Sequence, residues 1–215
     1  MRGKIRHIIF DLGGVLFNLD YSKSLVELEE LIGINLHDHI NLKQEVINHI
    51  AAYNAGNVTT ERFIWKFQHL SRGRVPQGQD IIKAWNAMML GWNPEVFTML
   101  QRLKKSYSLY LLSNINELHF QFYTRSLEPY GGLRWFESLF DKVYYSHHLG
   151  LVKPDEKIYD LVLQNHDLDP RQTIFIDDTE ENIIAAQEKG LYVVRHNVQA
   201  SITENIDRYL RLSHT

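Results

Sequence analysis

Short apolar runs recur along the chain, and between them lie longer stretches in which apolar residues return every three or four positions. A short continuous apolar run is typical of a strand that is buried on both faces of a sheet. The first such run, Ile8-Ile9-Phe10, ends directly at an acidic residue. The pattern predicts five strands, over residues 5–10, 107–112, 142–146, 173–176 and 191–194.

The stretch from Asp20 to Gly91 differs, because its apolar spacing indicates amphipathic helices and no segment in it reads as a strand. Helices are expected to begin near polar residues that suit the N-cap position, namely Ser22, Asp38, Thr59 or Thr60, and Asp80. Outside this stretch, further helices are expected to begin at Pro94, Pro154 and Thr179.

Alternating strands and helices imply a parallel sheet that carries helices on both faces. We therefore predict an α/β fold, a doubly wound parallel sheet with an inserted all-helical cap domain. The sheet domain is expected to comprise residues 1–17 and 92–215, and the cap residues 18–91. In such sheets ligands bind beyond the carboxyl ends of the strands, where the strand order reverses.

Composition excludes several classes of function. The chain has 215 residues, with 44% apolar and 23% charged, as in ordinary globular proteins. A net charge of −3 gives no overall basic field for nucleic acid or an acidic membrane, and no apolar run is long enough to cross a bilayer. The absence of cysteine excludes disulfides, zinc thiolates and thiol catalysis. The apolar run that follows the basic first residues is too short to be the core of a secretory signal. A cytoplasmic location is therefore expected.

Acidic residues end two of the predicted strands. Asp11 follows the first strand and precedes Gly13-Gly14, and the pair Asp177-Asp178 ends the fourth. Each alone is an ordinary turn residue, but two adjacent carboxylates at one sheet edge repel unless a cation binds them. Oxygen ligands without a nearby thiol favour Mg²⁺ over softer metals. The pattern predicts a cation-binding site at the carboxyl ends of the strands.

Two further segments could contribute to the same edge. Ser113 and Asn114 end the second strand, where a hydroxyl, an amide and backbone N–H groups could hold phosphate oxygens. Lys153 lies in a glycine-proline loop just before a predicted helix, and it could neutralise both a phosphoryl group and the acids. Taken singly, these are common turn residues and a common surface lysine.

The order of the four segments is more specific than any one of them. The segments are a strand followed by Asp11-Leu12-Gly13, a strand followed by Ser113-Asn114, Lys153-Pro154 before a helix, and a strand followed by Asp177-Asp178. This order resembles the motif order of the haloacid dehalogenase-like hydrolase superfamily. The resemblance covers the whole chain, including a helical cap between the first and second motifs, and implies a Rossmann-like core.

The resemblance implies a phosphatase that acts through an aspartyl-phosphate on a small phosphorylated metabolite. Asp11 would attack phosphorus, and its other oxygen, the main-chain carbonyl of Gly13 and the carboxylate of Asp178 would bind Mg²⁺. Asp177 would assist, directly or through water. Lys153 would offset the charge of the nucleophile and the phosphoryl group.

The resemblance also implies where the substrate binds. Ser113 and backbone amides near Asn114 would hold the non-bridging phosphate oxygens. The cap would close over the site and set specificity, and its residues Tyr53 and Asn54 are candidates to face the substrate. Nucleic acid and membranes are not expected partners.

One departure from the family pattern concerns the proton donor. Phosphatases of the superfamily usually carry a second aspartate two positions after the nucleophile, and this chain has Gly13. General acid catalysis is worth roughly 10²–10⁴ in rate. Either another group, such as Asp20 or a cap residue, replaces the acid, or the leaving group needs little help, or the protein is slow or silent. A sugar phosphate such as a hexose 1-phosphate would fit the second case, because an anomeric hydroxyl leaves readily.

Two other classes compete with a phosphatase. A haloacid dehalogenase shares the nucleophile and the fold but needs no metal, and Asp177-Asp178 argues against it. A catalytically weak phosphate-binding or regulatory protein also gathers acids, a hydroxyl and a lysine on a doubly wound sheet. Such proteins usually carry the acid pair early and lack a large cap, whereas here the pair comes late.

Overall fold

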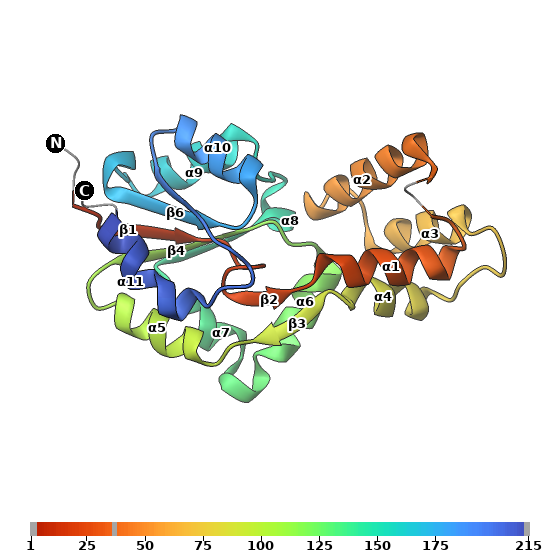
Figure 1. The fold of residues 1–215 in the computed structure, drawn as a ribbon, viewed down its shortest axis with the longest axis horizontal. Helices are drawn as coiled ribbons and strands as arrows, with labels where there is room; N and C mark the ends of the chain where they lie inside the picture. Colours follow the sequence, from red (N-terminus) through yellow and green to blue (C-terminus); the bar gives the residue numbers. More distant parts are fainter. Residues whose placement is uncertain (1–3, 36–37, 213–215) are drawn as a thin grey trace.

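The computed structural model describes residues 4–35 and 38–212 and is built around a five-stranded parallel sheet (Figure 1). Its strand order is β5–β4–β1–β6–β7, so the chain starts in the middle and builds outward on both sides. The five predicted strands are all present, with ends shifted by one or two residues: β1 (His7–Phe10), β4 (Ser108–Ser113), β5 (Lys142–Tyr145), β6 (Thr173–Asp177) and β7 (Tyr192–Arg195).

Helices cover both faces of the sheet, as the alternating pattern predicts. Ile9 of β1 faces the cluster that contains α9 (Glu156–Asn165) and α10 (Glu180–Glu188). Its neighbours Ile8 and Phe10 face the opposite cluster, which contains α5 (Glu95–Leu103) and α11 (Ile202–Leu212). These helix pairs lie on opposite sides of the sheet in Figure 1. Because successive side chains of a strand point to opposite faces, a continuous apolar run serves both cores.

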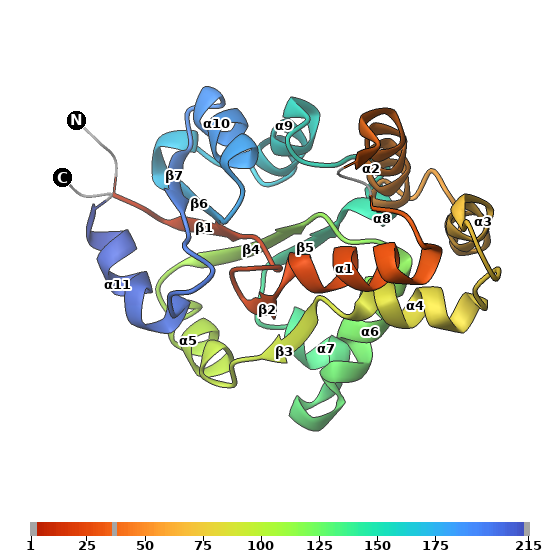
Figure 2. The ribbon, with the colours of Figure 1, turned by 45° about the vertical axis from the view of Figure 1, so that its right-hand side comes forward.

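Four helices form a separate group beyond the carboxyl ends of the strands (Figure 2). They are α1 (Tyr21–Ile32), α2 (Ile40–Asn54), α3 (Thr60–Leu70) and α4 (Gly78–Asn86). The group has its own hydrophobic cluster, with Phe63, Phe67 and Ile81 fully buried in it. The Asp20 side chain, rather than that of Ser22, caps α1 by accepting from the Ser22 backbone N–H. Thr59 caps α3 as predicted.

The expectation that no strand lies between Asp20 and Gly91 is wrong. Met89–Trp92 forms β3, which pairs antiparallel with β2 (Phe17–Leu19) and so links the helical group to the sheet. Both strands span the positions at which the sequence divides the chain into two domains, and that division stays a prediction. The two strands are short and lie about 70 residues apart in sequence, so neither has the alternating pattern that would identify it.

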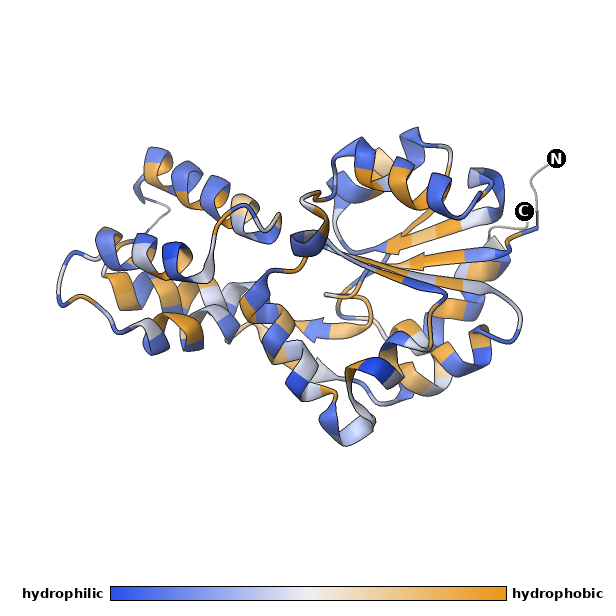
Figure 3. Cartoon of the chain, turned by 180° about the vertical axis from the view of Figure 1, so that it is seen from behind, coloured by the Kyte–Doolittle hydropathy of each residue, from blue (hydrophilic) through white to orange (hydrophobic). Residues whose placement is uncertain are grey.

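Three further helices follow strands β4 and β5. After β4 come α6 (Glu117–Ser126) and α7 (Gly132–Glu137), and after β5 comes α8 (Ser146–Leu149). Figure 3 shows the sheet strands largely in the hydrophobic colour and the surrounding helices with mixed colours, as expected for a sheet buried on both faces. Within the described part of the chain, none of the helices combines the length and apolarity needed to cross a bilayer.

Candidate active site

Two of the predicted acids lie side by side because their strands are neighbours. Strands β1 and β6 pair in parallel, with Phe10 opposite Ile176. The Asp11 backbone N–H donates to the carbonyl of Ile176 at 2.9 Å, and Asp177 ends β6. The strand order reverses at β1, which is where ligands bind in sheets of this type.

A buried lysine bridges these two acids. Lys153 Nζ lies 2.8 Å from Asp11 Oδ1 and 2.6 Å from Asp177 Oδ2, and all three side chains are almost completely buried. The pKa of Asp11 is raised to about 7, mainly by burial. The Lys153 charge lowers this pKa, and the charges of Asp177 and Asp178 raise it further. Burial alone would lower the pKa of Lys153, but Asp11 and Asp177 together raise it. The lysine therefore remains an ammonium ion in contact with the predicted nucleophile.

Asp177 and Asp178 differ in their surroundings. Asp177 accepts hydrogen bonds from the backbone N–H of Thr179 at 2.9 Å and from Asn182 Nδ2 at 3.0 and 3.1 Å, besides its contact with Lys153. Asp178 is partly buried, and burial and the Asp177 charge raise its pKa. Protein donors thus occupy both oxygens of Asp177, whereas the Asp178 carboxylate accepts a longer hydrogen bond, from Thr179 Oγ1 at 3.4 Å. Of the two, Asp178 is better placed to receive a cation.

The three acids fit a hard metal ion. Asp11, Asp177 and Asp178 each offer one carboxylate oxygen, and these oxygens lie within 4.8 Å of one another. Oxygen ligands of this kind suit Mg²⁺. Gly14 has a φ of +72°, and a Cβ there would lie 2.6 Å from Asp178 Oδ2. The glycine therefore allows the loop after β1 to approach the Asp178 carboxylate.

Gly13 leaves a space that other side chains occupy. A Cβ at this position would lie 2.6 Å from Leu19 Cδ1 and 3.8 Å from the hydroxyl of Tyr21. Tyr21 as a whole is about half exposed. Its hydroxyl lies beside position 13, where loss of solvent and the charges of Asp178, Asp11 and Asp177 raise the Tyr21 pKa, so the hydroxyl stays protonated. Asp20 is partly exposed, and hydrogen bonds from Ser22 lower its pKa. Of the two, only Tyr21 keeps a proton near neutral pH.

Asn114 positions the lysine loop. Its side-chain Oδ1 accepts from the Lys153 backbone N–H at 2.9 Å, and its Nδ2 donates to the Lys153 carbonyl at 2.8 Å. The Asn114 amide is therefore engaged by the protein. Ser113 is buried at the end of β4 and is not among the residues that line the cavity described next.

A cavity of about 550 Å³, here called the carboxyl-edge cavity, lies between the acids and the helical group. The lining residues at its sheet end are Asp11, Gly13, Asn114, Lys153, Pro154, Thr179, Glu181 and Asn182. Its remaining surface, here called the apolar wall, consists mainly of side chains from β2, α1–α4 and the turn after α4: Leu19, Leu25, Leu28, Val46, Ile50, Phe67, Trp85 and Met88. The sequence analysis did not identify this wall, because helical spacing alone does not separate core residues from residues that line a cavity.

The two cap residues expected to face substrate lie differently. Asn54 lines the carboxyl-edge cavity. Tyr53 is fully buried and is not a lining residue; its hydroxyl contacts Thr60 Oγ1 at 2.9 Å and accepts from the Leu118 backbone N–H at 3.2 Å. The structure gives Tyr53 a packing role in place of the substrate contact that the sequence suggested.

A polar network joins the helical group to α6. Asn116 donates to Asn54 Oδ1 at 2.9 Å and accepts from Trp85 Nε1 at 3.3 Å. His119 Nδ1 lies 3.1 Å from Asn116 Nδ2, and its Nε2 lies 3.1 Å from the Trp85 carbonyl. Burial lowers the pKa of His119 to about 4, so the ring is neutral at pH 7. Nothing in the sequence distinguishes Asn116, His119 or Asn182 from other polar helix residues.

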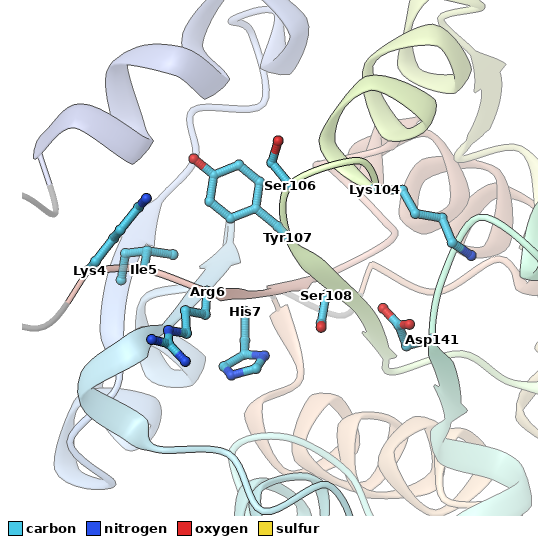
Figure 4. A pocket seen from close by; sticks show the side chains of 9 residues that line it. All are labelled: Lys4, Ile5, Arg6, His7, Lys104, Ser106, Tyr107, Ser108 and Asp141. Carbon is cyan, nitrogen blue, oxygen red and sulfur yellow. The ribbon is translucent and has the colours of Figure 1, made fainter.

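A second depression, here called the amino-edge hollow, lies at the opposite end of the strands (Figure 4). It measures about 740 Å³ and is lined by Lys4, Arg6, His7, Lys104 and Asp141, among others. Its lining residues include His7 and Ser108, which begin β1 and β4, whereas Asp11 and Asp177 lie at the ends of their strands. The larger depression is therefore separate from the acids and from Lys153.

Comparison with known families identifies the chain as a hydrolase. The sequence profile of the haloacid dehalogenase-like hydrolases matches residues 5–190. This range holds all four motifs and the helical group between the first and second.

Individual relatives cover most of the chain. A D-ribitol-5-phosphate phosphatase of Bacteroides thetaiotaomicron is 29% identical over 86% of this chain and 89% of its own length. A sesquiterpene phosphatase of Aspergillus oryzae is 26% identical over 85% of both chains. The structure is similar to that of a haloacid dehalogenase family enzyme from Bacteroides thetaiotaomicron in complex with magnesium and inorganic phosphate, with a TM-score of 0.76, 26% identity and coverage of 92% of this chain and 96% of that one.

Proposed function

The chain belongs to the haloacid dehalogenase-like hydrolase family, and we propose that it is a Mg²⁺-dependent phosphatase that hydrolyses a small phosphate monoester through an aspartyl-phosphate. The observation that carries the proposal is the buried cluster of Asp11, Lys153, Asp177 and Asp178 at the strand ends. A metal-free dehalogenase would need no cation among the carboxylates of Asp11, Asp177 and Asp178, whereas their close approach favours one. The phosphatase names of two relatives support the same choice.

In the proposed reaction Asp11 attacks phosphorus, the ester P–O bond breaks, and the leaving oxygen takes the proton of the Tyr21 hydroxyl. Water then attacks the aspartyl-phosphate and gives a proton back to Tyr21, which releases inorganic phosphate and restores the Asp11 carboxylate. Lys153 holds one oxygen of Asp11 at 2.8 Å and offsets the negative charge that gathers at the phosphoryl group. Buried charges interact strongly because water does not screen them.

The metal would be held by Asp11, the Gly13 carbonyl and Asp178. When bound it would neutralise phosphoryl charge. In this proposal Asp177 is a positioning residue, because Lys153, Asn182 and the Thr179 N–H occupy its oxygens. A similar enzyme has been solved in complex with magnesium and inorganic phosphate, which supports a requirement for Mg²⁺.

Tyr21 is the proposed substitute for the missing acid. Its hydroxyl lies 3.8 Å from the point where the first side-chain atom of an aspartate at position 13 would stand. A protonated phenol there can donate a hydrogen bond to the leaving oxygen. This assignment replaces Asp20, whose carboxylate caps α1.

The substrate is not assigned by the relatives, since their names refer to a polyol phosphate and to a sesquiterpene. A hexose 1-phosphate remains one candidate, because its anomeric oxygen needs little protonation. A regulatory phosphate-binding protein is the competing function.

The test is phosphate release from p-nitrophenyl phosphate, sugar 1- and 6-phosphates and nucleotides, with Mg²⁺ and with EDTA. We expect turnover that needs Mg²⁺ and falls by about 10⁴-fold or more in Asp11→Asn. Turnover that survives EDTA or the Asp11→Asn change would contradict the mechanism. Tight binding of fluoroberyllate without phosphate release from any ester would favour the regulatory alternative.

A further inference from the structure

The apolar wall belongs to the hydrophobic core of the helical group. Val46, Phe67, Leu28 and Trp85 are almost completely buried and are members of that cluster, yet they also line the carboxyl-edge cavity. The wall begins at Leu19, next to Gly13, and extends across four helices. A phosphate at Asp11 would therefore place the rest of its ester against hydrocarbon.

Polar groups of the wall are already paired with the protein. Ser24 Oγ donates to the Trp85 carbonyl at 2.7 Å and accepts from the Met88 N–H at 3.0 Å. The Trp85 indole N–H donates to Asn116, and both nitrogens of His119 have partners. Few hydrogen-bonding groups of the wall therefore remain for hydroxyls of a substrate.

Tyr21 and Asn54 supply the main exceptions among the lining residues of the helical group. Asn54 Oδ1 accepts from Asn116, which leaves its amide nitrogen, and Tyr21 offers one hydroxyl. A five-carbon polyol phosphate carries four hydroxyls, each with a donor and two acceptor positions. A buried hydroxyl without a partner lowers affinity roughly 5- to 150-fold, whereas each buried methylene raises it about fourfold.

We propose that the substrate is the monophosphate ester of an apolar alcohol, with the hydrocarbon chain against the apolar wall. This inference rests on the proposed phosphatase function and adds its substrate class. If each non-hydrogen atom takes about the 30 Å³ of a liquid water molecule, the cavity of about 550 Å³ holds a phosphate and on the order of ten to fifteen further atoms.

The matched substrates are n-pentyl phosphate and ribitol 5-phosphate, which share a five-carbon chain and differ by four hydroxyls. We expect kcat/KM to be at least tenfold higher for n-pentyl phosphate, and to rise about fourfold for each methylene from pentyl to octyl. The alkoxide of the polyol is the better leaving group, so intrinsic reactivity alone would make ribitol 5-phosphate the faster substrate. Equal or faster turnover of ribitol 5-phosphate would overturn the proposal.

Binding separates the substrate class from the chemistry. Calorimetry with n-pentyl- and n-octylphosphonate, which cannot be hydrolysed, should give a Kd about 50-fold lower for the octyl compound. If this difference appears while no ester releases phosphate, the substrate class stands and the phosphatase function fails. If p-nitrophenyl phosphate is hydrolysed but chain length has no effect on Kd or kcat/KM, the apolar substrate is overturned and the phosphatase function stands.

Two pairs of variants locate the effect. Leu25 lines the cavity and Val26, its neighbour on α1, does not; Ile50 lines the cavity and Ile47, one turn earlier on α2, does not. Val26 and Ile47 are 51% and 46% exposed, so polar replacements there are tolerated. Leu25→Gln and Ile50→Gln should reduce the octyl-to-pentyl ratio of kcat/KM at least fivefold, and Val26→Gln and Ile47→Gln should preserve it. Equal ratios in all four variants would overturn the assignment of the wall.

Discussion

The carboxyl-edge cavity and the amino-edge hollow contain similar charged side chains in different surroundings. In the amino-edge hollow Lys4, Arg6, Lys104 and Asp141 are exposed. In the carboxyl-edge cavity Lys153 and Asp11 are almost completely buried and in direct contact. Water screens exposed charges, whereas burial strengthens each interaction and makes an unpaired charge costly. Burial and pairing, rather than the size of a depression, therefore identify the reactive edge of the sheet.

The largest expected difference between the two edges concerns their lysines. Lys153→Met should lower the free energy of unfolding by about 3–5 kcal/mol, because it leaves buried carboxylates without their partner, and should reduce kcat at least 100-fold. Lys104→Met, at the exposed edge, should change the unfolding free energy by no more than about 0.5 kcal/mol. Urea denaturation in EDTA measures both. Similar small losses in the two variants would remove the contrast between the edges.

Their histidines should differ in pH dependence. The pKa of His119 is about 4 in the folded protein and about 6.5 when unfolded. The unfolded chain therefore binds more protons between these values, so the stability from His119 is complete above pH 6.5 and is lost as the pH falls toward 4. The total is about 3 kcal/mol, of which about 2 should be lost between pH 7 and pH 5.

The control for this prediction is His7, which lies in the amino-edge hollow. Burial lowers the pKa of His7, as it does that of His119. Denaturation at pH 7, 6 and 5 should show a flatter pH dependence in His119→Gln than in the wild type, and a smaller change in His7→Gln. A wild-type slope in His119→Gln would show that another group controls acid stability.

The acids of the two edges should differ in metal binding. Asp178→Asn should weaken Mg²⁺ binding at least about tenfold, because it removes a proposed ligand. Asp141→Asn should leave Mg²⁺ affinity unchanged, because Asp141 lies in the amino-edge hollow, where its carboxylate accepts from the Leu109 N–H. The Mg²⁺-dependent rise in Tm measures both. Loss of affinity in Asp177→Asn but not in Asp178→Asn would reverse the roles of the paired acids.

The smallest effect concerns packing beside the nucleophile. Gly13→Ala should cost about 1 kcal/mol of unfolding free energy, because the new methyl meets the flexible end of Leu19 at 2.6 Å. Leu19→Ala in the same chain should remove most of the interaction, which a double-mutant cycle measures. Gly73→Ala, where a Cβ would meet nothing within 4 Å, is the control. Additive effects of the first two changes would mean that Leu19 does not fill the position.

The sequence predicts which acids come together at the carboxyl ends of the strands, because the signals for them are local. An apolar run that ends in an acid identifies both β1 with Asp11 and β6 with Asp177, and parallel pairing then brings these residues together. The sites that sequence misses depend on long-range contacts. Strands β2 and β3 are short and pair across the whole helical group.

Side-chain orientation on the helices also escapes prediction from sequence. Tyr53 and Asn54 are adjacent in α2, yet one is in the core and the other lines the cavity. Asn116 is held by Trp85, which comes 31 residues earlier in the chain. Asn182 is held by Asp177, at the end of the strand before its own helix, a contact that helical spacing does not predict. A helical periodicity of 3.6 residues assigns a face, but it does not say what lies opposite that face.

The ribbon formed by β2 and β3 has a consequence for how such a molecule can be rebuilt. The Asp20 N–H donates to the Met88 carbonyl at 2.9 Å, so the chain leaves and re-enters the ribbon at adjacent points. A tight turn between these residues would close a hairpin and dispense with α1–α4 altogether, and a different insert could be grafted onto the same two ends. If the helical group selects the substrate as proposed, such an exchange would change substrate choice and remove Tyr21, while the four motifs of the sheet would remain in place.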